Sequence, residues 1–239
     1  MIFDPLELNY TKVKAWLDCP HLYKYCYIDR KFTPHSPFSA LGISVHRALH
    51  RFHSQGGGLD GLILYYDEGW HHGGYGTPQQ SMEFYNLGRK ILENYWKADA
   101  AADRRETLFT EREFEFEFER WRIRGTIDRV DRVPGGCEVI DYKMGFEDRT
   151  AGDLKKDLQL AIYALAVQKA FGLEARSVAW FLLVKGEKIS VPYDPASADA
   201  LLALLRDTGE KILALDLSRK GNCAACSIRA LCAVSEAKN

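Results

Sequence analysis

The segment 109–118, FTEREFEFEF, alternates between apolar and charged residues along almost its whole length. In an extended chain Phe114, Phe116 and Phe118 point to one side, and the glutamates between them point to the other. This two-residue period is typical of a β-strand with one buried face and one face in water. The middle of the chain therefore contributes a strand to a half-buried sheet.

The segments that follow continue this sheet. Residues 121–130 predict a second strand, the sequence ValProGlyGly at 133–136 predicts a turn, and residues 137–143 predict a third strand, which together make an antiparallel meander. Residues 177–184 are almost continuously apolar, as expected of a buried central strand, and 187–193 follow as a short strand.

Helical periodicity surrounds these strands. Helices are predicted at 39–54, 59–70, 79–99, 156–171 and 195–217, with short helices within 10–30. The order is helices, meander, helix, strands and helix. It predicts an α/β fold in which one central mixed β-sheet is flanked by helices.

Composition excludes several classes of protein. The 239 residues suit one large domain or two small ones, and 46% hydrophobic with 27% charged residues is ordinary for a globular chain. A net charge of −1 argues against coating nucleic acid by bulk charge, although local phosphate contacts stay possible. No apolar run approaches the roughly 20 residues of a bilayer span. The acidic N-terminal segment also lacks the features of a signal peptide, so we expect a soluble cytoplasmic protein with no membrane partner.

An acidic site is predicted where the second and third strands meet. Asp128 comes late in the second strand, and Asp141 and Lys143 end the third on one side of it, with the backbone carbonyl of Tyr142 between them. Two neighbouring carboxylates repel each other and normally need a cation, and hard oxygen ligands suit Mg²⁺ or Mn²⁺. A lysine beside the metal can orient a water and offset charge that develops on a phosphate.

A simpler interpretation is that Asp128 to Arg132 form a surface ion-pair ladder and that Asp141 pairs with Lys143. Asp141 disfavours this, because it follows two apolar residues at the end of a core strand and a carboxylate there needs a partner. His46, four residues after Gly42 on one helix face, would by itself be an ordinary helical histidine.

Five motifs in order resemble the PD-(D/E)XK nuclease superfamily. They are Gly42-x3-His46, Glu111, Gly125-x2-Asp128-Arg129, Asp141-Tyr142-Lys143 and Gln159-x3-Tyr163. Within that superfamily they resemble the RecB-like branch, which includes the AddB nuclease domain and the CRISPR-associated RecB-like exonucleases. The resemblance covers residues 8–233.

This resemblance implies a restriction-endonuclease-like fold in a single nuclease domain, 1–239. Its expected parts are a mainly helical part at 1–105, a catalytic sheet core at 106–195 and a C-terminal helix with a cysteine-rich segment at 196–239. It also implies that the metal is bound by His46, Asp128, Asp141 and the Tyr142 carbonyl.

The same resemblance implies roles in catalysis and DNA placement. Lys143 would be the catalytic lysine, with Glu111, or its neighbour Glu113, as a further acidic residue. Gln159 and Tyr163 would help to place the DNA. Before that helix, Lys155 and Lys156 are the best candidates for phosphate contacts.

The cysteines predict a second metal site. Cys223-x2-Cys226-x5-Cys232 and the remote Cys19 make a set of four thiolates, which suits zinc or an iron–sulfur cluster. Spacing alone does not decide between them, although zinc ribbons usually pair two CxxC hairpins. The nuclease resemblance implies a 4Fe-4S cluster that joins the N- and C-terminal helical segments.

The function expected from these features is a metal-dependent DNA exonuclease that acts on single-stranded ends. The resemblance implies recombination and repair or CRISPR spacer processing as the setting, with a helicase or a CRISPR integrase as a possible partner. No GxxxxGK[ST] motif occurs, so unwinding would come from a partner. The alternative is a catalytically weak DNA-binding or assembly module that uses the cluster as a scaffold.

Overall fold

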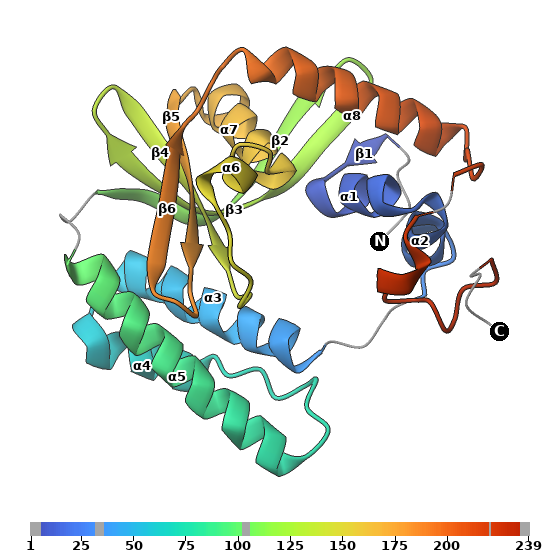
Figure 1. Ribbon diagram of the computed structural model, residues 1–239. Coiled ribbons are helices and arrows are strands. Elements are labelled where there is room, and N and C mark those ends of the chain that lie inside the picture. Colours follow the sequence, from blue (N-terminus) through green and yellow to red (C-terminus); the bar gives the residue numbers. More distant parts are fainter. Residues whose placement is uncertain (1–5, 32–35, 102–105, 220, 235–239) are drawn as a thin grey trace. The chain divides into compact units, whose positions relative to one another are not determined.

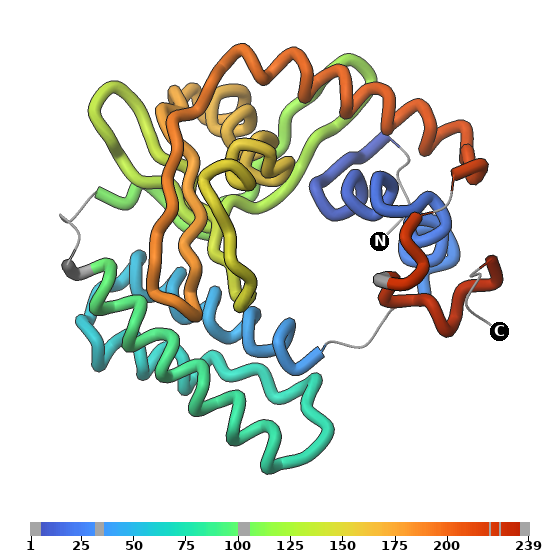
Figure 2. The backbone as a smooth tube through the Cα atoms, viewed as in Figure 1, coloured from blue at the N-terminus to red at the C-terminus, as the bar shows by residue number. Residues whose placement is uncertain are grey.

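The computed structural model describes residues 6–31, 36–101, 106–219 and 221–234, and Figures 1 and 2 trace the chain. The chain forms two compact units. Unit 1 comprises Met1–Thr33, Glu115–Gly125 and Pro195–Asn239, and unit 2 comprises Pro34–Phe114 and Thr126–Asp194. Two long strands pass from one unit into the other, and the units are described in turn.

Unit 2 is built on a mixed sheet. Its strands are β2 (Thr107–Phe118), β3 (Trp121–Val133), β4 (Gly136–Lys143), β5 (Ala175–Leu182) and β6 (Glu187–Pro192). Strands β3 to β6 are neighbours in sequence order, and β2 pairs with β3. The β3–β4 and β5–β6 pairs are antiparallel, whereas β4 and β5 are parallel. The predicted α/β fold with a mixed central sheet is thus confirmed.

Helices cover both faces of this sheet (Figure 1). On one face lie α3 (Pro37–Gln55), α4 (Gly58–Glu68) and α5 (Pro78–Ala101), and the other carries α6 (Ala151–Leu154) and α7 (Leu158–Phe171). The first three helices share one apolar core with Ile140 and Tyr142 of β4 and with Ala179 and Phe181 of β5. Alternation along β4 therefore turns Asp141 and Lys143 toward the face on which α7 packs.

Helix α3 illustrates why the sequence folds locally as it does. The Ser36 hydroxyl caps the helix by accepting a hydrogen bond from the Ser39 N–H, and Pro37 occupies the first turn, where its missing N–H is not needed. Leu41, Val45 and Leu49, which recur at helical spacing, are fully buried. A glycine with a φ of +73°, Gly56, ends the helix. The helix predicted at 39–54 is confirmed.

One predicted helix was wrong in its extent. The segment 156–171 is not continuous with the chain before it, because Asp157 caps α7 by accepting a hydrogen bond from the Leu160 N–H at 2.8 Å. Aspartate favours this N-cap position over a helix interior. As a result Lys155 and Lys156 lie in the turn between α6 and α7.

Unit 1 combines the far halves of β2 and β3 with the two ends of the chain. Its other elements are β1 (Glu7–Leu8), α1 (Tyr10–Asp18), α2 (Pro20–Tyr23), the π-helix Lys24–Ile28, α8 (Ser197–Leu213) and the 3-10 turn Cys223–Ala225. Strand β1 is parallel to β3 at Arg122 and Ile123. The sequence did not predict β1, because two residues are too short to display a period.

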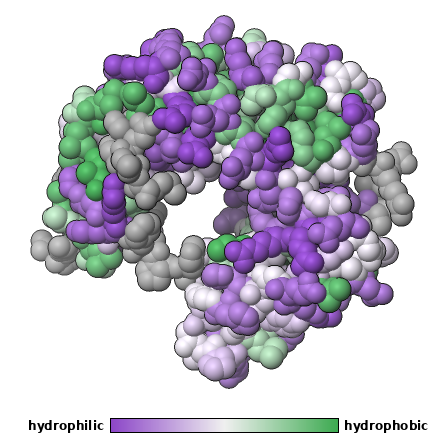
Figure 3. All heavy atoms as spheres, turned by 180° about the vertical axis from the view of Figure 1, so that it is seen from behind, coloured by the Kyte–Doolittle hydropathy of each residue, from purple (hydrophilic) through white to green (hydrophobic). Residues whose placement is uncertain are grey.

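The surface gives no sign of a membrane-crossing helix. Within the described ranges, every helix is too short or too polar to cross a bilayer. The face drawn in Figure 3 carries hydrophilic residues over much of its area.

Candidate functional site

Two carboxylates meet where the β3–β4 ladder ends. The last pair in register is Arg129 with Ile140, so Asp128 and Asp141 are the next residues along the two strands. Asp128 Oδ2 accepts a hydrogen bond from the Tyr142 N–H at 2.8 Å. The Asp128 carboxylate thus provides an acceptor for the backbone N–H of Tyr142, which lies beyond the last paired residues of the two strands. The Asp128 side chain is itself nearly buried. The hairpin therefore brings Asp128 and Asp141 together, as the sequence predicted.

His46 reaches the same point from α3. Its Nδ1 lies 3.2 Å from Glu111 Oε1 and 3.9 Å from Asp128 Oδ2. One ligand atom from each of these three side chains falls within 4.8 Å of the others, and the described residues contain no second such group of His, Cys, Asp and Glu. An imidazole with two carboxylates is a donor set that fits a divalent cation.

Glu111 reaches His46 because the backbone of β2 is irregular there. Its φ is +46°, in the left-handed region, whereas strict alternation would place it on the exposed side with Glu113. A non-glycine residue in this conformation costs about 1–2 kcal/mol, and such strain is found most often at functional sites. Glu111 rather than Glu113 faces His46, and no regular strand pattern could have predicted that.

Asp141 and Lys143 form the other side of the site. Lys143 Nζ lies 2.6 Å from Asp141 Oδ2 and donates a hydrogen bond to Gln159 Oε1 at 2.8 Å. Gln159 in turn donates from Nε2 to the Tyr163 hydroxyl at 2.9 Å. The sequence motif on α7 therefore holds the lysine from the side opposite Asp141.

Oδ2 of Asp141 is buried against the ammonium of Lys143. The two atoms lie 2.6 Å apart, so the ammonium is a charged partner for this oxygen. A buried carboxylate needs such a partner. The support for a metal therefore comes from the donor set of His46, Glu111 and Asp128, beside which this pair lies.

The electrostatics of the site also favour a cation. Burial would lower the pKa of His46, but the carboxylates of Asp128 and Glu111 outweigh it and raise that pKa to about 9. Burial raises the pKa of Asp128, and burial together with the Asp128 charge raises the pKa of Asp141. Negative charge is thus crowded into a site with little solvent, and a divalent ion would neutralise it.

Behind the site lies a buried polar network that the sequence did not reveal. Arg129 pairs with Asp131 at 2.7 Å and with Asp99 at 2.8 Å, and it donates to the Tyr95 hydroxyl. Tyr95 also hydrogen-bonds to the Tyr142 hydroxyl at 3.1 Å. The network anchors the residue between Asp141 and Lys143. The one feature of the sequence that points to this network is Arg129, a charged residue at a buried position of β3.

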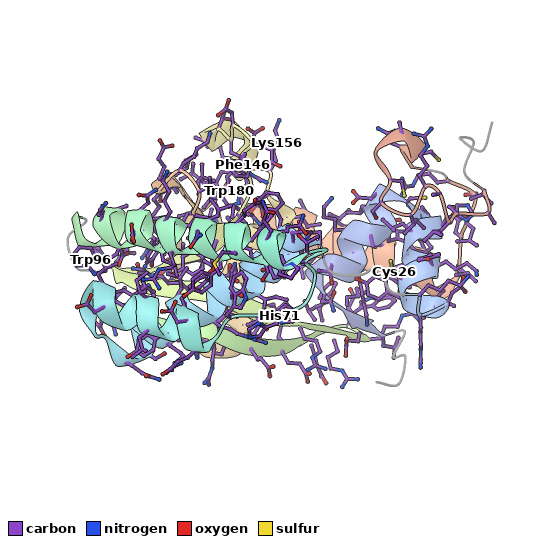
Figure 4. The ribbon with its side chains drawn as sticks, turned by 90° about the horizontal axis from the view of Figure 1, so that it is seen from below. Cys26, His71, Trp96, Phe146, Lys156 and Trp180 are labelled. Atoms are coloured by element: carbon purple, nitrogen blue, oxygen red, sulfur yellow. The ribbon has the colours of Figure 1, made fainter. Side chains whose placement is uncertain are left out.

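The remaining predicted DNA-contacting residues are less closely associated with the site. Lys155 and Lys156 are exposed in the turn before α7, and Figure 4 labels Lys156. A cavity of about 550 Å³ opens beside the metal-binding group and is lined in part by Gly42, His46 and Glu111. The described structure therefore provides open space next to the candidate ligands.

The four predicted cluster cysteines gather in unit 1. Cys19, Cys223, Cys226 and Cys232 line one small cavity. Burial, with the nearby Cys226, raises the pKa of Cys26, whereas Cys137 is buried in β4 of unit 2. All six cysteines are free, and nowhere in the described chain do three of their sulfurs come within 4.8 Å of one another.

Comparison with known proteins gives three kinds of match. A family model described as the PD-(D/E)XK nuclease superfamily matches residues 7–233. The Gene 69 protein of Mycobacterium phage D29 is 26% identical over 222 residues, which are 77% of this chain and 78% of that protein. The Gene 69 protein of Mycobacterium phage L5 is 39% identical over 85 residues, 34% of this chain and 27% of its own length.

A solved structure shares the fold. It is that of a Eubacterium rectale protein provisionally named as an exonuclease, with a TM-score of 0.61 and 12% sequence identity. The match covers 95% of this chain and 88% of that protein. At this level of identity the likeness concerns the fold alone.

Proposed function

The chain belongs to the PD-(D/E)XK nuclease superfamily, and from this premise we propose that it is a metal-dependent deoxyribonuclease. The observation that carries the proposal is the convergence of His46, Glu111 and Asp128 within 4.8 Å. The buried Asp141–Lys143 pair beside them adds the acid and the ammonium that phosphodiester hydrolysis requires. The family match runs through both units, and we propose that they work as one nuclease domain.

We propose that Mg²⁺ or Mn²⁺ is held by His46, Asp128, Asp141 and the Tyr142 carbonyl, with Glu111 beside them. When bound, the cation lowers the pKa of a water and polarises the phosphate. Lys143, held between Asp141 and Gln159, orients that water and offsets the charge that develops on the phosphate oxygens.

The residues around this centre place the DNA. Tyr163 fixes Gln159, and Gln159 fixes the ammonium of Lys143, so this pair acts through the lysine. The exposed Lys155 and Lys156 are proposed to bind backbone phosphates, which would fix the strand without reading its sequence.

Within this function we propose an exonuclease that digests single-stranded ends. The motif resemblance supports that mode of action, and the provisional name of the Eubacterium rectale protein agrees with it. The same resemblance supports end processing in recombination and repair, or in CRISPR spacer acquisition, with a helicase or an integrase as partner. A DNA substrate and reduced thiolates both favour the cytoplasm.

The test is digestion of end-labelled oligonucleotides by the purified chain. With Mn²⁺ or Mg²⁺ we expect progressive shortening of single-stranded DNA from one end, slower loss of duplex DNA, and none in EDTA. Labels at the 5′ end and the 3′ end distinguish the polarity, and a circular single strand separates exonuclease from endonuclease activity. DNA binding without cleavage in any metal would contradict the proposal and support a DNA-binding or assembly module.

We propose further that the four cysteines of the unit 1 cavity bind a 4Fe-4S cluster. What supports one shared group is that all four cysteines line the same cavity. The choice of an iron–sulfur cluster over zinc rests on the nuclease resemblance. Soft thiolate ligands suit such a cluster.

Protein purified without oxygen should therefore contain iron and inorganic sulfide and show visible thiolate-to-iron charge-transfer absorption. Cys223→Ser should lose that absorption and unfold at lower denaturant concentration, because the tie between chain ends that are distant in sequence is lost. Cys137→Ala, in the other unit, is the matched control and should retain the colour. Stoichiometric zinc without iron would contradict the cluster.

A further inference from the structure

Two aromatic side chains of the described ranges are exposed and touch each other. They are Phe38 and Phe146, of which 43% and 57% of the surface is open; the other phenylalanines, tyrosines and tryptophans of those ranges are buried or partly buried. Their ring centroids lie 5.7 Å apart in an edge-to-face arrangement. Such apolar surface is unfavourable in water, so an exposed pair of rings suggests contact with another molecule.

Both rings belong to segments that lead directly to the metal-binding group. Phe38 precedes His46 by two turns of α3, about 12 Å along the helix axis. Phe146 follows Lys143 by three residues, which span at most about 11 Å of chain. Figure 4 labels Phe146 among the side chains of this part of unit 2.

The two segments also contact each other between the rings and the site. A Cβ at Gly42, midway between Phe38 and His46, would meet Met144 Cγ at 3.7 Å. Gly42 itself lines the open cavity that contains His46 and Glu111. The segments that carry the two rings therefore approach each other at Gly42, which borders the cavity of the candidate site.

The pair is held firmly on one side only. Phe38 packs edge-to-face on Phe84 of α5 with ring centroids 5.0 Å apart, and this contact holds the Phe38 ring in place. Phe146 lies over Phe38 and leaves more than half of its surface open. The two rings are nearly perpendicular and do not form one flat surface, but the open part of each ring can accept another flat ring by stacking.

We propose that Phe38 and Phe146 form a stacking surface for unpaired nucleobases of the strand whose phosphate occupies the metal-binding site. The inference rests on the proposed nuclease function and specifies its substrate as single-stranded DNA. Stacked bases in a duplex hide their faces, whereas an unpaired base can offer its face to an aromatic side chain. At about 3.4 Å or more per nucleotide, the contacted bases lie within about four nucleotides of the cleaved phosphate.

A nucleobase fits this surface better than a protein partner does. A stable protein interface buries about 800 Å² on each side, far more than two rings provide. The short chain distances from the two rings to His46 and Lys143 also specify nucleic acid as the molecule that would be present.

The experiment compares binding to two oligonucleotides of equal length in EDTA, so that it does not depend on catalysis. One is fluorescent oligothymidylate, and the other carries abasic sites at the same positions. Phe146→Ala and the double variant with Phe38→Ala should bind oligothymidylate about 10-fold and about 10–100-fold more weakly than the parent, since each stacked base contributes roughly a tenfold factor. Binding of the abasic strand should be unchanged.

Two further variants test whether weaker binding could come from the loss of any exposed apolar side chain or from unfolding. Leu64→Ala removes an apolar side chain of similar exposure, 52%, from α4 and should leave both affinities unchanged. Phe146→Trp keeps an aromatic surface and should restore binding, while thermal unfolding shows whether each variant is folded.

The outcomes separate this inference from the function on which it rests. Equal weakening on both strands, or none on oligothymidylate, overturns the stacking surface even if the parent cuts DNA normally. A parent chain that never cuts DNA but shows the base-dependent loss supports the stacking surface and contradicts the nuclease. A parent chain that binds neither strand in EDTA overturns the stacking surface, and the digestion assay with Mn²⁺ or Mg²⁺ then decides the nuclease by itself.

Discussion

Asp141→Asn is expected to reduce the rate of DNA hydrolysis by on the order of a thousandfold or more while leaving the protein folded. The asparagine keeps the size of the side chain but removes the charge that would hold the cation and that pairs with Lys143 at 2.6 Å. Initial rates on end-labelled single-stranded DNA over a range of Mn²⁺ concentrations measure the effect. A loss that higher Mn²⁺ fully restores would indicate weaker metal binding alone.

The same substitution should not destabilise the metal-free protein. Burial and the neighbouring Asp128 raise the pKa of Asp141 above its value in the unfolded chain. At neutral pH the ionised Asp141 carboxylate therefore lowers the free energy of unfolding, and the uncharged asparagine of the same size removes that unfavourable contribution. Asp148→Asn, whose side chain is 99% exposed, is the matched control and should keep full activity. Comparable activity losses in both variants would contradict the assignment.

Arg129→Ala is expected to lower the free energy of unfolding by about 3–5 kcal/mol. Its guanidinium is almost fully buried between Asp131 and Asp99, so its removal leaves two carboxylates without their cation in a poorly solvated region. The Tyr95 hydroxyl loses its donor as well. Urea denaturation followed by circular dichroism gives the free energy directly.

Arg132→Ala, three residues along the same strand, provides the comparison. Its side chain is 57% exposed and pairs with an exposed glutamate, Glu106, so its loss should cost at most about 1 kcal/mol. Two variants with equal losses would mean that the buried network does not stabilise the fold as proposed.

The sequence predicted the site best where a repeating pattern determines position. The strands predicted at 121–130 and 137–143 and the short turn after Val133 define a hairpin, and this hairpin brings Asp128 to Asp141. Helical spacing similarly placed Gln159 and Tyr163 on one face of α7, and the structure joins them by a hydrogen bond.

Departures from a pattern could not be predicted in the same way. Glu111 faces His46 through a left-handed backbone, and nothing in a run of alternating glutamates indicates which one departs. One partner of Arg129, Asp131, lies two residues away on the same strand, but Asp99 comes from α5, which is remote in sequence, so only the fold reveals it. Exposure, which singles out Phe38 and Phe146, is likewise a property of the folded chain.

The registered pairing of β3 with β4 ends just before Asp128 and Asp141. The length of each hairpin arm therefore determines whether the two carboxylates meet. Both arms run an equal number of residues from the turn to Asp128 and to Asp141. Adding one residue to a single arm would slide one strand past the other and rotate its carboxylate to the opposite face. A change in the length of one arm would therefore separate the two carboxylates without replacing any of the candidate ligands.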